Sequence, residues 1–161
     1  MTFFILVYIP ALVANGSATL VYSGHPLDFG KRLWDGRRIL GDGKTFEGFT
    51  LGTLYATSVA LAEALLAGDA RIALYGIVAG VGALLGDILG SFVKRRLGYE
   101  RGAHVPLLDQ LDFLLGAYAA TSVVGYRPPI LYAVVFAVMV YLLHRATNIA
   151  AYKLGIKPVP W

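Results

Sequence analysis

The feature that most constrains this chain is a series of five apolar stretches, each about as long as a helix that crosses a bilayer. A spanning helix needs about 20 mostly apolar residues. The stretches cover residues 3–22, 46–66, 72–92, 107–124 and 129–147. Hydrophobic residues make up 57% of the 161 residues and charged residues 15%, whereas soluble domains have roughly 45–50% and about 25%. The sequence therefore predicts an all-α polytopic membrane protein, a bundle of about five transmembrane helices forming a single domain over residues 1–161.

The fourth stretch is the least regular of the five, because Asp109 and Asp112 fall in its first turn. A half-buried or re-entrant helix is the alternative for this segment. The chain contains no cysteine, which excludes disulfides and thiolate metal sites.

Basic residues are distributed unevenly between the connections. The loop before the second stretch, the loop before the fourth and the C-terminal end carry five, four and three, namely Lys31, Arg32, Arg37, Arg38, Lys44, Lys94, Arg95, Arg96, Arg101, Arg145, Lys153 and Lys157. The two remaining loops hold only Arg71 and Arg127. Because cytoplasmic loops carry the excess of Lys and Arg, we expect the N-terminus outside and the C-terminus and long polar loops inside, in the plasma membrane. The isoelectric point near 9.4 fits a membrane face or a phosphate-bearing partner, not nucleic acid, because the bases gather beside the spans.

The third stretch contains an acid at membrane depth. An ionisable group there costs about 3 kcal/mol or more, which makes Asp87 a functional candidate. Ser91, Lys94 and Arg95 follow it on the same helical face. The alternative is an ion pair within the helix together with basic residues that anchor its cytoplasmic end.

The same stretch carries small residues at the spacing that lets membrane helices approach closely. They are Gly76, Gly80, Gly82, Gly86 and Gly90. We therefore expect this helix to be central in the bundle.

Asp109 and Asp112 are three residues apart, so on a helix their carboxylates project to one side and repel each other. A divalent cation would relieve this repulsion, because Mg²⁺ takes oxygen ligands and is often held by one or two carboxylates and substrate phosphates. The alternative is that Asp109 faces the helix dipole and Asp112 pairs with an arginine.

The segment "GDGKT", residues 41–45, resembles a nucleotide-binding loop. However, Arg38 stands where the G-x-x-x-x-G-K-[ST] motif needs its first glycine, and a membrane span follows. Glycine amides with Lys44 and Thr45 at a helix N-terminus can still hold phosphate oxygens. Asn15, near the middle of the first stretch, either binds substrate or bonds a neighbouring helix.

The stretch "SFVKRRLGYERGAHVPLLDQLDF", residues 91–113, resembles the signature of the CTP-dependent phosphatidate cytidylyltransferases. The matching residues are Ser91, Lys94, Arg95, Arg101, Pro106, Asp109 and Asp112. Two features depart from that signature: "PLL" replaces H-G-G, and Gln110 replaces an arginine. With "HPLDFGKRLWDGRRILGDGKTFEG", "GDILGSFVKRR" and five spans, the whole chain is more similar to the archaeal CDP-archaeol synthase family.

This resemblance implies transfer of a cytidylyl group from CTP to 2,3-bis-(O-geranylgeranyl)-sn-glycerol 1-phosphate, giving CDP-archaeol and pyrophosphate with Mg²⁺. It implies catalytic roles for Asp109, Asp112 and Lys94, with Asp87 joining the two aspartates as a metal ligand. The predicted substrate-binding residues are Lys44, Thr45, Arg95, Arg101, Ser91, Asp35, Arg37, Arg38, Glu47 and Asn15. Partners would be CTP, the isoprenoid lipid, the membrane and a second copy of the chain. A CDP-alcohol phosphotransferase and a small transporter are the alternatives.

Overall fold

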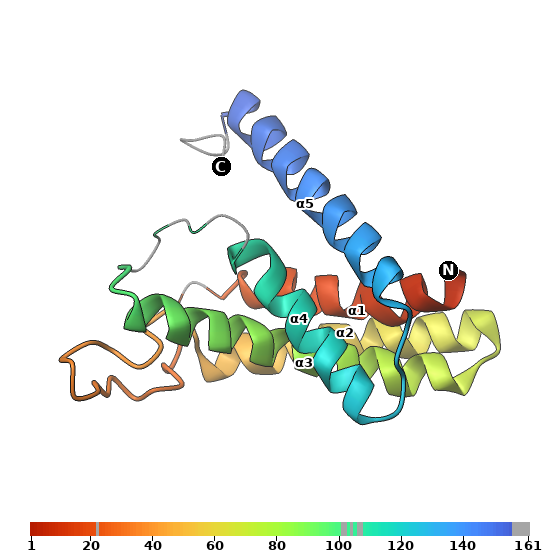
Figure 1. Cartoon of the computed structure of the whole chain (residues 1–161), viewed down its shortest axis with the longest axis horizontal. Helices are drawn as coiled ribbons and strands as arrows, with labels where there is room; N and C mark the ends of the chain where they lie inside the picture. Colours follow the sequence, from red (N-terminus) through yellow and green to blue (C-terminus); the bar gives the residue numbers. More distant parts are fainter. Residues whose placement is uncertain (22, 101–102, 104, 106–107, 156–161) are drawn as a thin grey trace. The chain divides into compact units, whose positions relative to one another are not determined.

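The computed structural model describes residues 1–21, 23–100, 103, 105 and 108–155 (Figure 1). Within them the chain forms five α-helices and no strand, so the predicted all-α class is confirmed. The helices are α1 (Thr2–Ala18), α2 (Phe46–Ala67), α3 (Ala70–Arg96), α4 (Leu108–Val123) and α5 (Ile130–Lys153). The chain forms two compact units, Met1–Arg127 and Pro128–Trp161. The second unit contains α5, and the single domain stays a prediction.

Three helices in the described part of the chain are long and apolar enough to cross a bilayer, namely α2, α3 and α5 over Ile130–Ala150. The other two are shorter than the sequence suggested. With 17 and 16 residues, α1 and α4 are about 25 Å long, less than the hydrocarbon thickness of about 30 Å. At the end of α1 the hydroxyls of Ser17 and Thr19 donate to the carbonyl oxygens of Val13 and Gly16.

Helix α3 is central in the first unit, as its glycines predicted, and packs against α1, α2 and α4 (Figure 1). A Cβ at Gly76 would lie 2.8 Å from the Ala60 methyl of α2. On the side that faces α4, a Cβ at Gly82 would lie 2.7 Å from the carbonyl oxygen of Gly116. Such distances are too short for a side chain, so these close helix contacts require glycine.

A buried hydrogen bond joins α1 to α4. The hydroxyls of Tyr8 and Thr121 are 2.9 Å apart, and the Thr121 hydroxyl is also 3.0 Å from the carbonyl oxygen of Ala117. Both side chains are buried. Because an unpaired hydroxyl is costly in an apolar interior, this pair helps to fix where α4 crosses α1.

The loop between α1 and α2 is organised by a buried carboxylate. Asp28 is 5% exposed and accepts hydrogen bonds from the backbone amides of Gly30, Leu40 and Gly41 and from the Arg38 guanidinium. Burial alone would raise the pKa of Asp28, but the Arg38 guanidinium and these amides outweigh it and hold the pKa well below its usual range. Asp28 therefore sets the path of the chain into residues 41–45.

The same loop is tied to the C-terminal end of α3. The Arg96 guanidinium donates to Asp35 at 2.7 Å and to the Arg38 carbonyl oxygen at 2.5 Å. In return, Arg37 donates to the Arg96 carbonyl oxygen at 2.7 Å. These bonds bring the loop beside the basic end of α3, where the candidate site lies.

Candidate functional site

Lys44 reaches from the loop to the acid inside α3. Its Nζ lies 2.5 Å from Asp87 Oδ2. Two hydrogen bonds fix the backbone around Lys44. Thr45 caps α2 by accepting from the Gly48 amide at 3.1 Å, and the Leu27 amide donates to the Lys44 carbonyl oxygen at 2.8 Å. The loop thus supplies the cation that stabilises the acid at membrane depth.

A second lysine–aspartate pair joins α3 to α4. Lys94 Nζ lies 2.7 Å from Asp109 Oδ1, and the other carboxylate oxygen accepts from the Val105 amide at 3.0 Å. Lys94 comes seven residues after Asp87, two helical turns along the same face. The two ion pairs therefore lie toward the N-terminal ends of α2 and α4 and the C-terminal end of α3.

Asp112 lies between these pairs and is 7% exposed. Its carboxylate packs against Gly90 of α3, where a Cβ would lie 2.8 Å from the Asp112 Cγ. It is within electrostatic range of Asp87, Lys44 and Lys94. Three carboxylates thus share two ammonium groups, so one negative charge has no matching lysine.

The predicted metal set, Asp87, Asp109 and Asp112, is not gathered around one point. In the part of the chain that the structure describes, no three acidic or histidine side chains come close enough together to hold a metal ion. Lysine ammonium groups occupy the positions next to Asp87 and Asp109. The donor set nevertheless fits Mg²⁺ chemically, because all three side chains offer carboxylate oxygens and carry a surplus negative charge.

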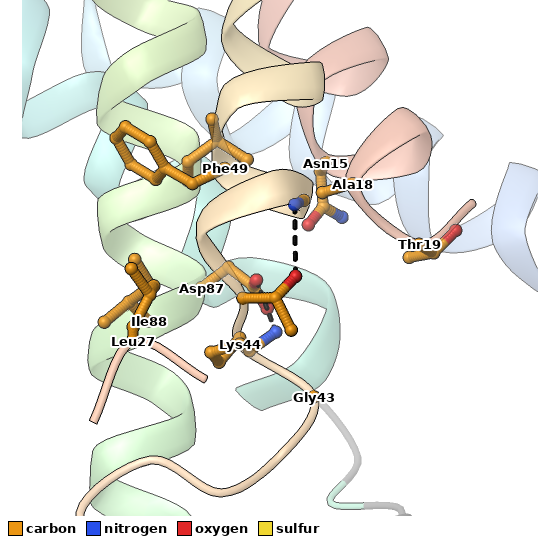
Figure 2. A pocket seen from close by; sticks show the side chains of 12 residues that line it. Asn15, Ala18, Thr19, Leu27, Gly43, Lys44, Phe49, Asp87 and Ile88 are labelled. Atoms are coloured by element: carbon orange, nitrogen blue, oxygen red, sulfur yellow. Dashed lines mark hydrogen bonds and ion pairs between the residues drawn. The ribbon is translucent and has the colours of Figure 1, made fainter. Parts of the chain in front are cut away.

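The first of two cavities opens beside these pairs, with a volume of about 80 Å³. We call it the helix cavity. Figure 2 shows Asn15, Lys44 and Asp87 around it, together with apolar side chains such as Phe49 and Ile88. The mid-helix Asn15 therefore lies at the site, next to the lysine–aspartate pair.

The second cavity, here the lysine cavity, has a volume of about 160 Å³. It is lined by Ser91, Lys94 and Arg95 of α3 and by the loop segment that includes Lys44. Because Lys44 lines both cavities, they are neighbours. The two cavities thus bring together half of the predicted site residues, namely Asn15, Lys44, Thr45, Asp87, Ser91, Lys94 and Arg95.

The other predicted substrate-binding residues have partners that shape the loop. Arg38 forms ion pairs with Asp28 and Asp42, and Asp35 pairs with Arg96 as described above. Glu47 accepts from the His25 amide at 2.7 Å and pairs with the His25 ring. Arg101 lies outside the described residues. For this second group the geometry gives a positioning role, and contact with substrate stays a prediction.

Sequence reasoning missed two residues that hold the site together, Asp28 and His25, and assigned no role to either. The one local signal for Asp28 is a carboxylate two residues before a glycine, a pattern that favours a turn closed by the side chain. Its bonds to Leu40 and Gly41 connect residues more than ten positions apart, which spacing does not reveal.

Comparison with known proteins places this geometry in a family. The chain matches a family model described as "CarS-like: CDP-archaeol synthase" over residues 1–161. It is 51% identical to a CDP-archaeol synthase of Hyperthermus butylicus over 98% of this chain and 94% of the relative. It is 50% identical to one of Sulfolobus acidocaldarius over 98% of this chain and 96% of the relative.

A solved structure is also similar. An intramembrane enzyme for archaeal membrane lipids biosynthesis is 46% identical, with a TM-score of 0.86 over 90% of this chain and 92% of that one. This likeness covers most of the helical fold. The chain is a membrane protein that belongs to the CDP-archaeol synthase family.

Proposed function

We propose that this protein transfers the cytidylyl group of CTP to the phosphate monoester of 2,3-bis-(O-geranylgeranyl)-sn-glycerol, forming CDP-archaeol and pyrophosphate. The observation that carries the proposal is the pair of lysine–aspartate contacts around buried Asp112, beside two cavities that share Lys44. The names of the relatives support the product. A transporter would not need two lysines and three carboxylates at one end of its helices.

The chemistry requires charge neutralisation more than proton transfer. A phosphate monoester is largely ionised at neutral pH and attacks without a general base. Two anions must approach each other and a pyrophosphate must leave, and positioned cations stabilise such phosphoryl groups. Lys44 and Lys94, each on a flexible four-carbon stem, can turn from Asp87 and Asp109 toward phosphate oxygens.

When the lysines turn to phosphate, the carboxylates are left without their cations. Asp109, Asp112 and Asp87 would then hold Mg²⁺, which would neutralise charge on the CTP phosphates. The chain's own residues therefore exchange partners: ammonium groups bind phosphate oxygens, and carboxylates become available to a metal. Ser91 and Arg95 would orient the triphosphate from the lysine cavity, and Thr45 and Asn15 the lipid phosphate from the helix cavity.

Incorporation of labelled CTP into lipid tests the reaction. Purified protein in detergent should convert the isoprenoid glycerol phosphate and CTP to a labelled lipid and release one pyrophosphate per product, with EDTA stopping the reaction and Mg²⁺ restoring it. Asp109→Asn and Lys94→Met should lower turnover by at least about 100-fold, the usual effect of removing one group that stabilises a transition state. Asp69→Asn and Arg71→Met are matched controls, because that ion pair lies at the opposite end of α3. Absence of turnover by the wild-type protein with any isoprenoid glycerol phosphate would overturn the proposal.

We also propose that the site faces the cytoplasm, with the N-terminus outside. The basic loop between α1 and α2 supports this orientation. Because the chain has no cysteine, Lys31→Cys and Ala67→Cys can be labelled separately in intact cells. An impermeant maleimide should react only with Ala67→Cys, and the reverse result would invert the orientation. Self-association of the chain is a separate point of the proposal, which light scattering in detergent tests.

A further inference from the structure

A third hollow lies where the first loop meets the C-terminal end of α3. Its volume is about 460 Å³. We call it the arginine pocket, and its charged and aromatic lining is Arg32, Arg37, Arg38, Arg95, Tyr99 and Glu100. Four guanidinium groups and one carboxylate therefore surround a space much larger than the lysine cavity.

Three of these arginines keep their charge free for a ligand. Arg32 donates to the Gly36 carbonyl oxygen at 2.8 Å, Arg37 to the Arg96 carbonyl oxygen at 2.7 Å, and Arg95 to the Glu100 carbonyl oxygen at 3.0 Å. Within the described ranges none of the three forms an ion pair with a carboxylate. By contrast, Arg38 is neutralised by Asp28 and Asp42.

Neutral carbonyl oxygens leave both the charge and the remaining N–H groups available, because a guanidinium has five donors. For Arg95 the available donors are terminal N–H groups, because its Nε is buried. An anion with several oxygens would satisfy these donors. Glu100 offsets only part of the positive charge.

The three spaces form a series. Lys44 lines both the helix cavity and the lysine cavity, and Arg95 lines both the lysine cavity and the arginine pocket. The helix cavity has apolar walls from α2 and α3, whereas the arginine pocket is lined by the first loop and by the end of α3 with the residues that follow it. The lysine cavity is therefore the middle space of the three.

This order matches the geometry of phosphoryl transfer. The attacking and leaving oxygens lie roughly in line on opposite sides of the phosphorus. A lipid phosphate oxygen would form a bond to the α-phosphorus, and the bond between that phosphorus and the oxygen bridging to the β-phosphorus would break, with the electron pair leaving on pyrophosphate. A nucleophile that enters from the membrane side thus places the leaving group on the loop side.

We propose, on the basis of the proposed function, that the arginine pocket binds the β- and γ-phosphates of CTP and retains them as pyrophosphate after the transfer. Arg32 and Arg37 provide the charge-assisted bonds at the far end, and Arg95 connects them to the α-phosphate. A diphosphate suits this pocket better than a single phosphate, because the guanidinium groups come from two separate elements, the loop and α3.

Inhibition by pyrophosphate tests the assignment. With the full-length protein in detergent, Arg32→Gln and Arg37→Gln should each raise the inhibition constant of pyrophosphate about tenfold or more, as expected for losing one charged hydrogen bond. The KM for CTP should rise in parallel. Arg127→Gln is the matched control, because among the residues that the structure describes this arginine also bonds only a carbonyl oxygen, and it lies at the other end of α4. Inorganic phosphate should inhibit the wild-type protein at least tenfold more weakly than pyrophosphate.

A direct measurement of pyrophosphate binding separates loss of binding from loss of folded, active protein. Calorimetric titration of pyrophosphate into protein without lipid should show the same tenfold loss of affinity in the Gln variants. Arg32→Lys and Arg37→Lys keep the charge but lose the planar guanidinium group, so their affinities should fall between those of wild type and the Gln variants. Unchanged pyrophosphate constants in both Gln variants, or equal inhibition by inorganic phosphate, would overturn this assignment and leave the proposed function intact. Inhibition that follows the anionic lipid content of added vesicles instead of soluble pyrophosphate would identify a headgroup site. A wild-type protein without turnover would count against the proposed function itself, while the calorimetric result would still decide the pocket.

Discussion

Replacement of Gly90 by alanine tests whether the position of the Asp112 carboxylate matters for activity. The new Cβ would lie 2.8 Å from both Cβ and Cγ of Asp112, whereas ordinary van der Waals contact begins at 3.4 Å. These atoms must therefore move away by at least about 0.6 Å. Rotation of the side chain cannot relieve the contact with the Asp112 Cβ, so α4 itself has to shift along or away from α3.

Two opposing free-energy terms follow from this geometry. Alanine in place of glycine inside a helix stabilises it by about 1 kcal/mol, while overpacking of a tight interface costs about 1–3 kcal/mol. We expect a net loss of stability of about 1 kcal/mol. The effect on turnover should be larger, because a displacement of about 1 Å at a reacting centre can lower the rate about 100-fold.

The assay is incorporation of labelled CTP into lipid, recorded with the melting temperature in the same detergent. Gly16→Ala is the matched control, because this glycine also lies within a helix and a Cβ there would meet nothing within 4 Å. The control should be at least as stable as wild type and fully active. If Gly90→Ala were as active as Gly16→Ala, the position of Asp112 would not limit the reaction and its proposed metal role would be lost.

Three further substitutions test the scaffold. Asp28→Asn should lower stability by about 3 kcal/mol, because it leaves the buried side of the Arg38 ion pair without its charge; a melting temperature within a degree of wild type would refute this. Tyr8→Phe removes only the hydroxyl that bonds across to α4, and urea unfolding should show a loss of about 1 kcal/mol, whereas no loss would mean that the bond does not hold α4. The hydrogen bond to Glu47 raises the pKa of His25 above its usual value of 6.5, so its stabilisation is present below about pH 6.5 and is lost as pH rises through the raised pKa. The difference in melting temperature between wild type and His25→Gln should therefore shrink between about pH 6 and pH 9, and a constant difference would contradict the pairing.

Much of the bundle could be predicted because its signals are local. Helix α3 combines an uninterrupted apolar run with glycines at packing intervals, and both signals come from residues close together in the sequence. Asp87 of this helix could also be identified from the sequence, because a charge within an apolar run needs a partner. The C-terminal end of α1 was harder to predict, because apolar residues continue beyond Ala18, where the helix ends.

The pairing of the site residues could not be predicted from their spacing. Lys44 and Asp87 are 43 positions apart, and their contact depends on the path of a loop that Asp28 fixes from the inside. The sequence indicated that the carboxylates needed positive charge and that the loop contained it. It did not indicate which lysine meets which acid, because that depends on hydrogen bonds between backbone amides and one buried carboxylate.

The glycines of α3 connect the packing of this bundle to its chemistry. Gly86 and Gly90 were predicted as packing residues, and they do allow α4 to approach α3, but the atoms that fill the space they leave come mainly from Asp112. A helix pair held this close keeps a carboxylate away from water and within range of two lysines. A larger residue at either glycine therefore disturbs both the helix packing and the arrangement of charges. Evolution of a larger residue at either glycine would require a compensating change in α4, so the small residues of α3 constrain the site as strongly as its charged ones.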